Sequence, residues 1–196
     1  MLAVYLGDQR GYLSREELTA HVQGLASLPS LLGRMLKDPG AYSSLAERFF
    51  QSDHFLYLGR GVNYPVAMEG ALKLKEVSYI HAEGYPAGEM KHGPISLIDE
   101  AMPVVALVPQ DSLHGKMLNN INEVKARGGM VIAVASEGDT EIADRADEVV
   151  YIPAVSELAN PMLMALPMQL LAYHIAVWRG CDVDQPRNLA KTVTVE

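Results

Sequence analysis

The sequence predicts an α/β fold: a three-layer αβα sandwich built on a parallel sheet of about five strands. Two observations favour this fold class. Short, almost entirely apolar runs alternate along the chain with longer stretches that carry apolar residues at helical spacing. Strands that are apolar on both faces are typical of a parallel sheet covered by helices on each side.

Four runs have the length and composition of buried strands, and each is bounded by turn residues or by polar residues. They are residues 54–59, 103–109, 130–136 and 148–153. Residues 81–99 are rich in glycine and proline, so we expect a loop there. Ligands of such sheets bind at the carboxyl ends of the strands, near helix N-termini.

The predicted helices fill the stretches around and between these strands. They cover residues 14–52, 63–80, 112–129 and 157–179. Ser14 is a suitable N-cap, because Glu16 and Glu17 follow in the first turn. Pro65 lies in the first turn of the second helix, where a missing N–H costs nothing.

Composition limits the function classes. The chain has 196 residues, 49% of them apolar, and a net charge of −8. This charge argues against nonspecific binding to nucleic acid, which needs a basic surface, and suits a cytoplasmic protein. Cys181 is the single cysteine, so no internal disulfide can form. The first ten residues do not have the pattern of a signal peptide.

One stretch is apolar enough to raise the question of a membrane span. Residues 158–178 contain no Asp, Glu, Lys or Arg, but they include Pro161, Pro167, Gln169 and His174. We interpret the stretch as a buried helix of a globular domain and expect no membrane association.

The helix pattern at residues 68–80 carries the most pointed chemistry. Glu69, Lys73 and Glu76 are spaced four and three apart, so they share one helix face. The simplest interpretation is a solvated, salt-bridged surface. The alternative is a carboxylate held ionised beside an amine, which could move a proton between the first two carbons of a sugar.

Two loops offer weaker signals. The turn "GRGVNYP" (59–65) lies between a strand and a helix, where phosphate can bind. A glycine turn at this position more often serves only to connect the strand and the helix tightly, without binding a ligand. His92 lies in the Gly-Pro-rich segment 82–94, where an exposed imidazole could donate a proton to a ring oxygen or could be merely solvated. No histidine pair has metal-ligand spacing, so we expect neither a metal nor a cofactor.

Two long stretches resemble one known family. The segment "EGALKLKEVSYIHAEGYPAGEMKHGP" and the ending "DVDQPRNLAKTVTVE" are similar to the C-terminal sugar-isomerase (SIS) domain of the glucosamine-6-phosphate synthase family. The resemblance runs from about His54 to Glu196. It implies a flavodoxin-like SIS fold, and a function in converting fructose 6-phosphate and glutamine-derived ammonia to glucosamine 6-phosphate.

The resemblance assigns three catalytic roles. Lys191 matches the lysine that forms a Schiff base with the open-chain sugar. Glu76 matches the base that moves a proton between the first two sugar carbons. His92 matches the group that assists ring opening, and in the family this group reaches the site from the neighbouring subunit, which implies a homodimer.

The resemblance also assigns residues that contact or orient the substrate. Lys73 matches a lysine lining the site, Ala190 a tail residue against the sugar, and Arg187 is placed to fix the approach of the tail. We therefore divide the chain into an N-terminal helical segment packing on the domain (1–52), the SIS domain (53–182) and a C-terminal active-site tail (183–196).

The rest of the family pattern is expected outside this sequence. Cys181 does not match the N-terminal cysteine nucleophile of a glutaminase domain, so we expect a piece of a longer polypeptide that also carries a glutaminase domain and a first SIS domain. The loop after the strand 103–109 has only Ser112, beside Asp111, where SIS domains usually bind phosphate with several Ser and Thr residues. The first SIS domain would then supply the phosphate site.

Two alternatives remain open. A regulatory SIS module would bind a sugar phosphate without catalysis, and it would need the phosphate loop but not Glu76, His92 and Lys191. A free-standing phosphosugar isomerase of similar length is the second alternative, and the tail "DQPRNLAKTVTVE" argues against it.

Overall fold

A computed structural model describes residues 1–37, 40–187 and 189. The helices are α1 (Leu2–Gln9), α2 (Arg15–Met35), α3 (Gly40–Phe49), α4 (Asn63–Ser78), α5 (His114–Lys125) and α6 (Asn160–Trp178). The strands are β1 (His54–Gly59), β2 (His81–Pro86), β3 (Pro103–Val108), β4 (Met130–Ser136) and β5 (Glu148–Ile152). Three 3₁₀ helices complete the list: η1 (Ala87–His92), η2 (Pro94–Leu97) and η3 (Ile142–Asp144).

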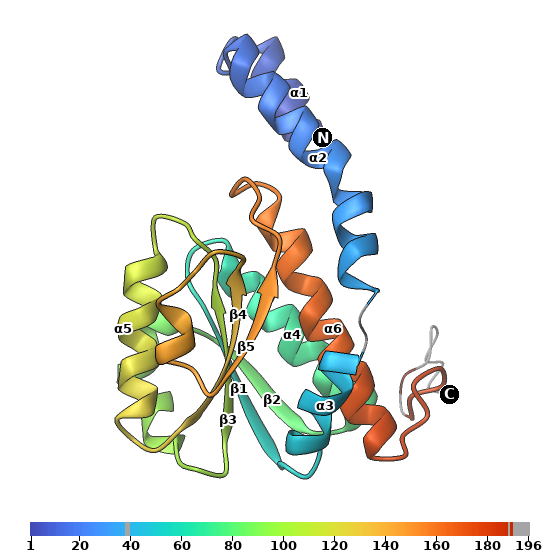
Figure 1. The fold of residues 1–196 in the computed structure, drawn as a ribbon, viewed down its shortest axis with the longest axis vertical. Helices are drawn as coiled ribbons and strands as arrows, with labels where there is room; N and C mark the ends of the chain where they lie inside the picture. The colour runs from blue at the N-terminus through green and yellow to red at the C-terminus, as the bar shows by residue number, and fades with distance from the viewer. Residues whose placement is uncertain (38–39, 188, 190–196) are drawn as a thin grey trace, which may run out of the picture.

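The five strands form one parallel sheet in the order β2-β1-β3-β4-β5. Helices α3, α4 and α6 cover one face, and α5 with η1 covers the other (Figure 1). This confirms the predicted three-layer sandwich. The chain moves outward from β1 to β2 and then returns past β1 to β3, so the strand order reverses between β1 and β3. That reversal is where ligands usually bind in such sheets.

Each face of the sheet contributes to a separate apolar core because side chains alternate along a strand. Val105 and Leu107 of β3 pack into the core that α4 and α6 complete. Val104 and Ala106 of the same strand pack into the core below α5. All four side chains are fully buried. This double burial explains why β3 is an unbroken apolar run in the sequence.

Strand β2 is the strand that the sequence prediction missed, since it lies within the expected loop 81–99. It pairs with β1 from His54 opposite His81 to Gly59 opposite Pro86. Because β2 is an edge strand, it needs less apolar character than the central strands, and only Ala82 is buried. Gly84 is needed for packing: a Cβ there would lie 2.6 Å from the Cα of Met68, so α4 packs directly on the strand.

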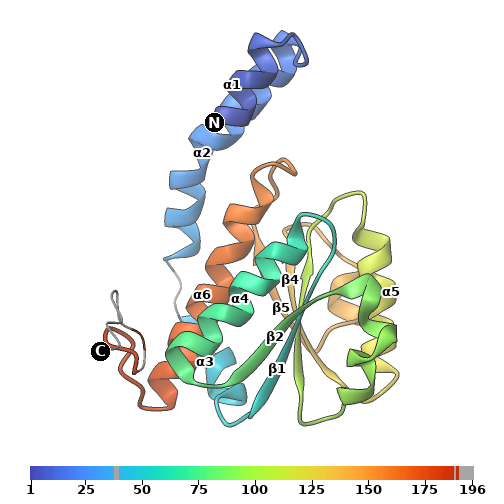
Figure 2. The ribbon, with the colours of Figure 1, turned by 180° about the vertical axis from the view of Figure 1, so that it is seen from behind.

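The N-terminal helices differ in how they meet the sandwich. α3 packs against α6, and Leu28 of α2 belongs to the same apolar core. The first turns of α2 project away from the layered body together with α1, which the sequence did not predict (Figures 1 and 2). Ser14 is the N-cap of α2 as predicted, and it forms reciprocal hydrogen bonds with Glu17.

Helix α6 is the one described helix that is long and apolar enough to cross a membrane by length and composition. It packs against α4 and α3, and Leu163, Met164 and Ile175 are among its fully buried side chains. The helix therefore contributes to the core of the sandwich, in agreement with the interpretation from the sequence.

Candidate active site

The outer face of α4 carries a compact group of charges. The Nζ atom of Lys73 lies 2.8 Å from Oε2 of Glu76 and 3.5 Å from Oε1 of Glu69. On the opposite face of the helix, Ala71 and Leu74 are buried against the sheet. The three charged side chains are between 27% and 43% exposed to solvent, so a ligand can reach them. They share one face, as the spacing predicts.

The charge on Lys73 is stabilised by its partners. The hydrogen bond to Glu76 raises the pKa of the Lys73 ammonium, and the charge of Glu69 adds to this effect against the opposing effect of burial. Lys73 is consequently protonated at neutral pH and is a poor nucleophile there. Its contribution to a reaction would be a fixed positive charge beside two carboxylates.

Arg187 lies at the end of the same helix. Tyr79 directly follows α4, and its hydroxyl accepts a hydrogen bond of 2.8 Å from the backbone N–H of Arg187. The guanidinium of Arg187 lies 4.1 Å from the centre of the Tyr79 ring. Figure 2 shows the segment after α6 returning beside the C-terminal end of α4. Ala190 and Lys191 lie outside the described residues.

His92 lies elsewhere in the fold. It is the last residue of η1, its side chain is 76% exposed, and its nearest charged partner is Glu89 at 3.6 Å. The Met90 side chain of η1 is buried in the core on the α5 face of the sheet. Lys91 of η1 forms an ion pair with Glu123 of α5. Glu76 lies on the helix layer that covers the other face. One copy of this chain therefore does not bring His92 and Glu76 together.

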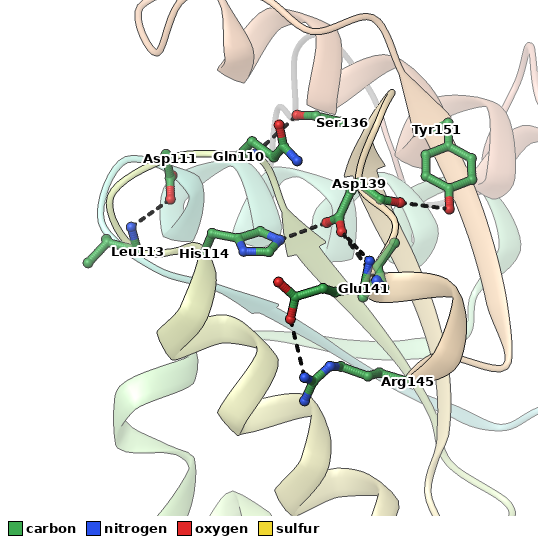
Figure 3. Close-up of polar contacts among 10 residues, drawn as sticks. Gln110, Asp111, Leu113, His114, Ser136, Asp139, Glu141, Arg145 and Tyr151 are labelled. Carbon is green, nitrogen blue, oxygen red and sulfur yellow. Dashed lines mark hydrogen bonds and ion pairs between the residues drawn. The ribbon is translucent and has the colours of Figure 1, made fainter.

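The carboxyl end of β3 does not present a free phosphate-binding loop. One carboxylate oxygen of Asp111 accepts a hydrogen bond of 2.8 Å from the N–H of Leu113 (Figure 3), and the other accepts from the side chain of Asn63 at 3.1 Å. The Asp111 carboxylate thus accepts from a backbone N–H at the start of α5 that would otherwise be free to donate to a bound anion.

A second polar group at this edge was missed by the sequence analysis. Nε2 of His114 lies 2.7 Å from Oδ2 of Asp139, whose side chain is 2% exposed (Figure 3). The other oxygen of Asp139 accepts from the backbone N–H groups of Glu141 and Ile142. His114, Asp139 and Glu141 line a cavity of about 340 Å³, to which Asp111 adds a third carboxylate. His114 and Asp139 meet only because β3 and β4 are neighbours in the sheet.

The glycine turn after β1 has a structural explanation. A Cβ on Gly59 would lie 2.2 Å from the carbonyl oxygen of Asn63, so only glycine fits where β1 turns into α4. The guanidinium of Arg60 covers Gly88 at the start of η1. Among the described residues, no group of three or more His, Cys, Asp or Glu side chains could hold a metal ion.

Comparison with known proteins places these features in a family. The model of the SIS domain family matches residues 48–179, and the chain belongs to that family. The C-terminal domain of glucosamine-fructose-6-phosphate aminotransferase from Francisella tularensis is a similar solved structure. It has a TM-score of 0.88 and 39% identity over 94% of this chain and 52% of that one.

Curated relatives are similar over the whole chain. Glutamine–fructose-6-phosphate aminotransferase (isomerizing) from Thermus thermophilus is 55% identical, and the enzyme of the same name from Chlorobaculum tepidum is 53% identical. Each match covers 100% of this chain and 32% of the relative. The chain therefore spans about a third of the length of these relatives.

Proposed function

We propose that this chain is the catalytic part of the isomerase half of a synthase that makes glucosamine 6-phosphate from fructose 6-phosphate and ammonia derived from glutamine. The similarity to aminotransferases of that name supports the reaction. The observation that carries the proposal is the group Glu69, Lys73 and Glu76, which places an accessible carboxylate beside a fixed ammonium on α4.

The proposed reaction uses three residues in named roles. The amine of Lys191 attacks the carbonyl carbon of the open-chain ketose, and loss of water gives a Schiff base. Ammonia then adds to the Schiff-base carbon and displaces the Lys191 amine, which leaves an imine of the ketose at that carbon. Glu76 takes a proton from the first sugar carbon and returns it to the second, which converts the imine into the 2-amino aldose and regenerates the carboxylate. His92 of a neighbouring subunit assists ring opening, in keeping with its exposure and with the position of η1 on the other face of the sheet from α4.

Three further residues would bind or orient the substrate. Lys73 stabilises negative charge that develops on sugar oxygens during the proton transfer. Ala190 contacts the sugar, and Arg187 holds the approach of the tail through its contacts with Tyr79. The phosphate group would be bound by a preceding SIS domain, because Asp111 occupies the corresponding loop here.

The proposal includes an assembly. The polypeptide would carry a glutaminase domain and a first SIS domain before this chain, act in the cytoplasm and form a homodimer. The first test is the flanking coding sequence. A glutaminase domain that begins with cysteine after its initiator methionine is expected upstream, and an unrelated upstream region would contradict the assembly.

The second test is an activity assay. The complete polypeptide should form glucosamine 6-phosphate from fructose 6-phosphate and glutamine, and Glu76→Gln should lower this activity by roughly 100-fold or more. The chain 1–196 alone should show no glutamine-dependent synthesis. If the complete protein binds the sugar phosphate but never converts it, the chain is a regulatory SIS module and the catalytic proposal is wrong.

A further inference from the structure

Tyr79 has a backbone conformation that is unusual for its residue type. It caps the C-terminus of α4 with φ 62° and ψ 17°, in the left-handed region. Among the described residues it is the one non-glycine residue with positive φ. Glycine is the usual residue at this position of a helix end, because a side chain there is strained. A strained residue of this kind suggests that the side chain itself is needed.

Within the described part of the chain, the Tyr79 side chain has a hydrogen bond and a cation–π contact, and both are with Arg187. Its hydroxyl accepts the hydrogen bond from the N–H of Arg187 at 2.8 Å. Its ring lies under the guanidinium of Arg187, 4.1 Å from ring centre to Cζ. Ring stacking and a hydrogen bond to the backbone together fix both the position and the direction of the chain at Arg187.

The segment between α6 and Arg187 is arranged to reach this contact. The Asp182 carboxylate accepts hydrogen bonds of 3.0 Å from the N–H groups of Asp184 and Gln185, which form a turn. The thiol of Cys181 lies 3.9 Å from the carbonyl oxygen of Ser78, the last residue of α4. The chain that leaves α6 is therefore held against the end of α4 before it continues into the tail.

The same helix end carries the proposed base. Glu76 lies three residues before Tyr79, a rise of about 4.5 Å along a helix. Lys191 lies four residues after Arg187, and four extended residues span at most about 14 Å. An anchor at Arg187 thus limits how far Lys191 can lie from the end of α4, the helix that carries Glu76 and Lys73.

We infer that Tyr79 is a positioning residue of the synthase: it anchors the tail at Arg187 and so sets where the Lys191 amine meets the sugar relative to Glu76. The inference rests on the proposed function for the roles of Lys191 and Glu76. The anchor itself rests on the contacts of Tyr79 and is measurable without any reaction.

The experiment compares Tyr79→Phe, Tyr79→Leu and Arg187→Lys in the complete polypeptide. The Phe variant removes only the hydroxyl, whereas the Leu variant removes the ring as well. Tyr12→Phe and Arg10→Lys are the matched controls, because Tyr12 is 80% exposed and both residues lie in the projecting N-terminal region. Amide hydrogen exchange of a peptide covering residues 182–187 reports on the anchor, and steady-state kinetics report on the chemistry.

We expect the amides of the 182–187 peptide to exchange faster in all three variants than in the unsubstituted polypeptide. The two control variants should exchange at the unsubstituted rate. The kcat for synthesis should fall roughly fivefold in Tyr79→Phe, as expected for one lost hydrogen bond, and further in Tyr79→Leu. KM for fructose 6-phosphate should change less than kcat, because the phosphate site is elsewhere. Combining Tyr79→Leu with Arg187→Lys should add little to the larger single effect.

Two results would overturn the inference. Unchanged exchange of the 182–187 peptide in Tyr79→Leu would show that Tyr79 does not anchor the tail. Faster exchange with unchanged kcat would show that the anchor does not position the reacting amine. If the unsubstituted polypeptide makes no glucosamine 6-phosphate, the proposed function fails instead, and faster exchange in the variants would still establish the anchor.

Discussion

The ammonium of Lys73 and the carboxylate of Glu76 form a hydrogen-bonded ion pair of 2.8 Å on the outer face of α4. The pair raises the pKa of Lys73. The interactions that raise the pKa of Lys73 stabilise the fold at every pH below 10.5, the pKa of an unfolded lysine. This stability is lost only as the pH rises through the higher pKa of the folded state. Lys73 therefore keeps its positive charge throughout the neutral range, where the proposed reaction would occur.

The first prediction concerns the base. Glu76→Gln retains the size and a hydrogen-bond acceptor for Lys73 but cannot take up a proton. We expect kcat for glucosamine 6-phosphate formation to fall by roughly 100-fold or more, the usual contribution of general base catalysis. Affinity for fructose 6-phosphate should change little. Glu69→Gln is the matched control, and an equal loss in both variants would argue against a special role for Glu76.

The second prediction concerns the packing that places α4. A Cβ at position 84 would lie 2.6 Å and 2.8 Å from the backbone Cα and N of Met68, so Gly84→Ala must push α4 away from β2. We expect a loss of about 1–3 kcal/mol in the free energy of unfolding, measured by denaturant titration. Gly33→Ala is the control, because nothing lies within 4 Å of its Cβ.

In that control, alanine should stabilise α2 by about 0.5–1 kcal/mol, since glycine is unfavourable inside a helix. If Gly84→Ala proved as stable as Gly33→Ala, the close contact between β2 and α4 would be disproved.

A third prediction follows from the hydroxyl of Tyr57. The side chain is fully buried, and its hydroxyl has no hydrogen-bond partner among the described residues. Burial raises the pKa of this phenol. A buried hydroxyl without a partner costs about 1–3 kcal/mol, so Tyr57→Phe should increase the free energy of unfolding by about 1 kcal/mol.

The comparison for this prediction is Tyr151→Phe. The Tyr151 hydroxyl donates to the carbonyl oxygen of Asp139 at 3.2 Å (Figure 3). Its removal should lower stability by about 0.5–1 kcal/mol. Opposite signs for the two substitutions are expected in thermal or denaturant unfolding. A loss of stability in Tyr57→Phe would show that the hydroxyl has a partner, such as an internal water.

The pH dependence of stability provides a fourth prediction. Burial lowers the pKa of His174 below its ordinary value of 6.5. The fold therefore favours the neutral imidazole, and stability should fall as the pH drops from about 6.5 through the lowered folded value. His174→Gln should reduce this slope. Above pH 7 the free energies of unfolding of the two proteins should depend on pH in the same way. An unchanged slope of stability against pH below pH 6.5 would show that His174 does not cause the loss of stability.

The sequence predicts the fold well where burial is complete. The runs that became β1, β3 and β4 are apolar because these strands are almost entirely buried. The run that became β5 is also apolar, although this strand lies at the edge of the sheet and only Ile152 is buried. The boundaries of all four strands agree with the predicted ranges within one residue. β2 was missed because an edge strand with Gly84 and Pro86 has the composition of a loop. α1 was missed because its apolar residues are mostly exposed and give no clear periodicity.

In the candidate site, contacts between residues close in sequence could be predicted, and contacts between distant residues could not. The face shared by Glu69, Lys73 and Glu76 follows from helix geometry alone, because the residues are close in sequence. The contacts between Tyr79 and Arg187, and between His114 and Asp139, join residues that are 108 and 25 positions apart. Only the tertiary fold brings such residues together. The proposed roles of Lys191 and His92 came from family resemblance, and their chemistry stays a prediction.

The central claim is that the tail lysine, and not the lysine of α4, becomes bonded to the sugar. Lys73 is held protonated by Glu76, which makes it a poor nucleophile. The direct measurement is borohydride trapping of the complete polypeptide with fructose 6-phosphate, followed by peptide mass mapping. We predict a reduced sugar adduct on Lys191 and none in Lys191→Arg, whose synthase activity should be lost. An adduct on Lys73, or full activity of Lys191→Arg, would contradict the account.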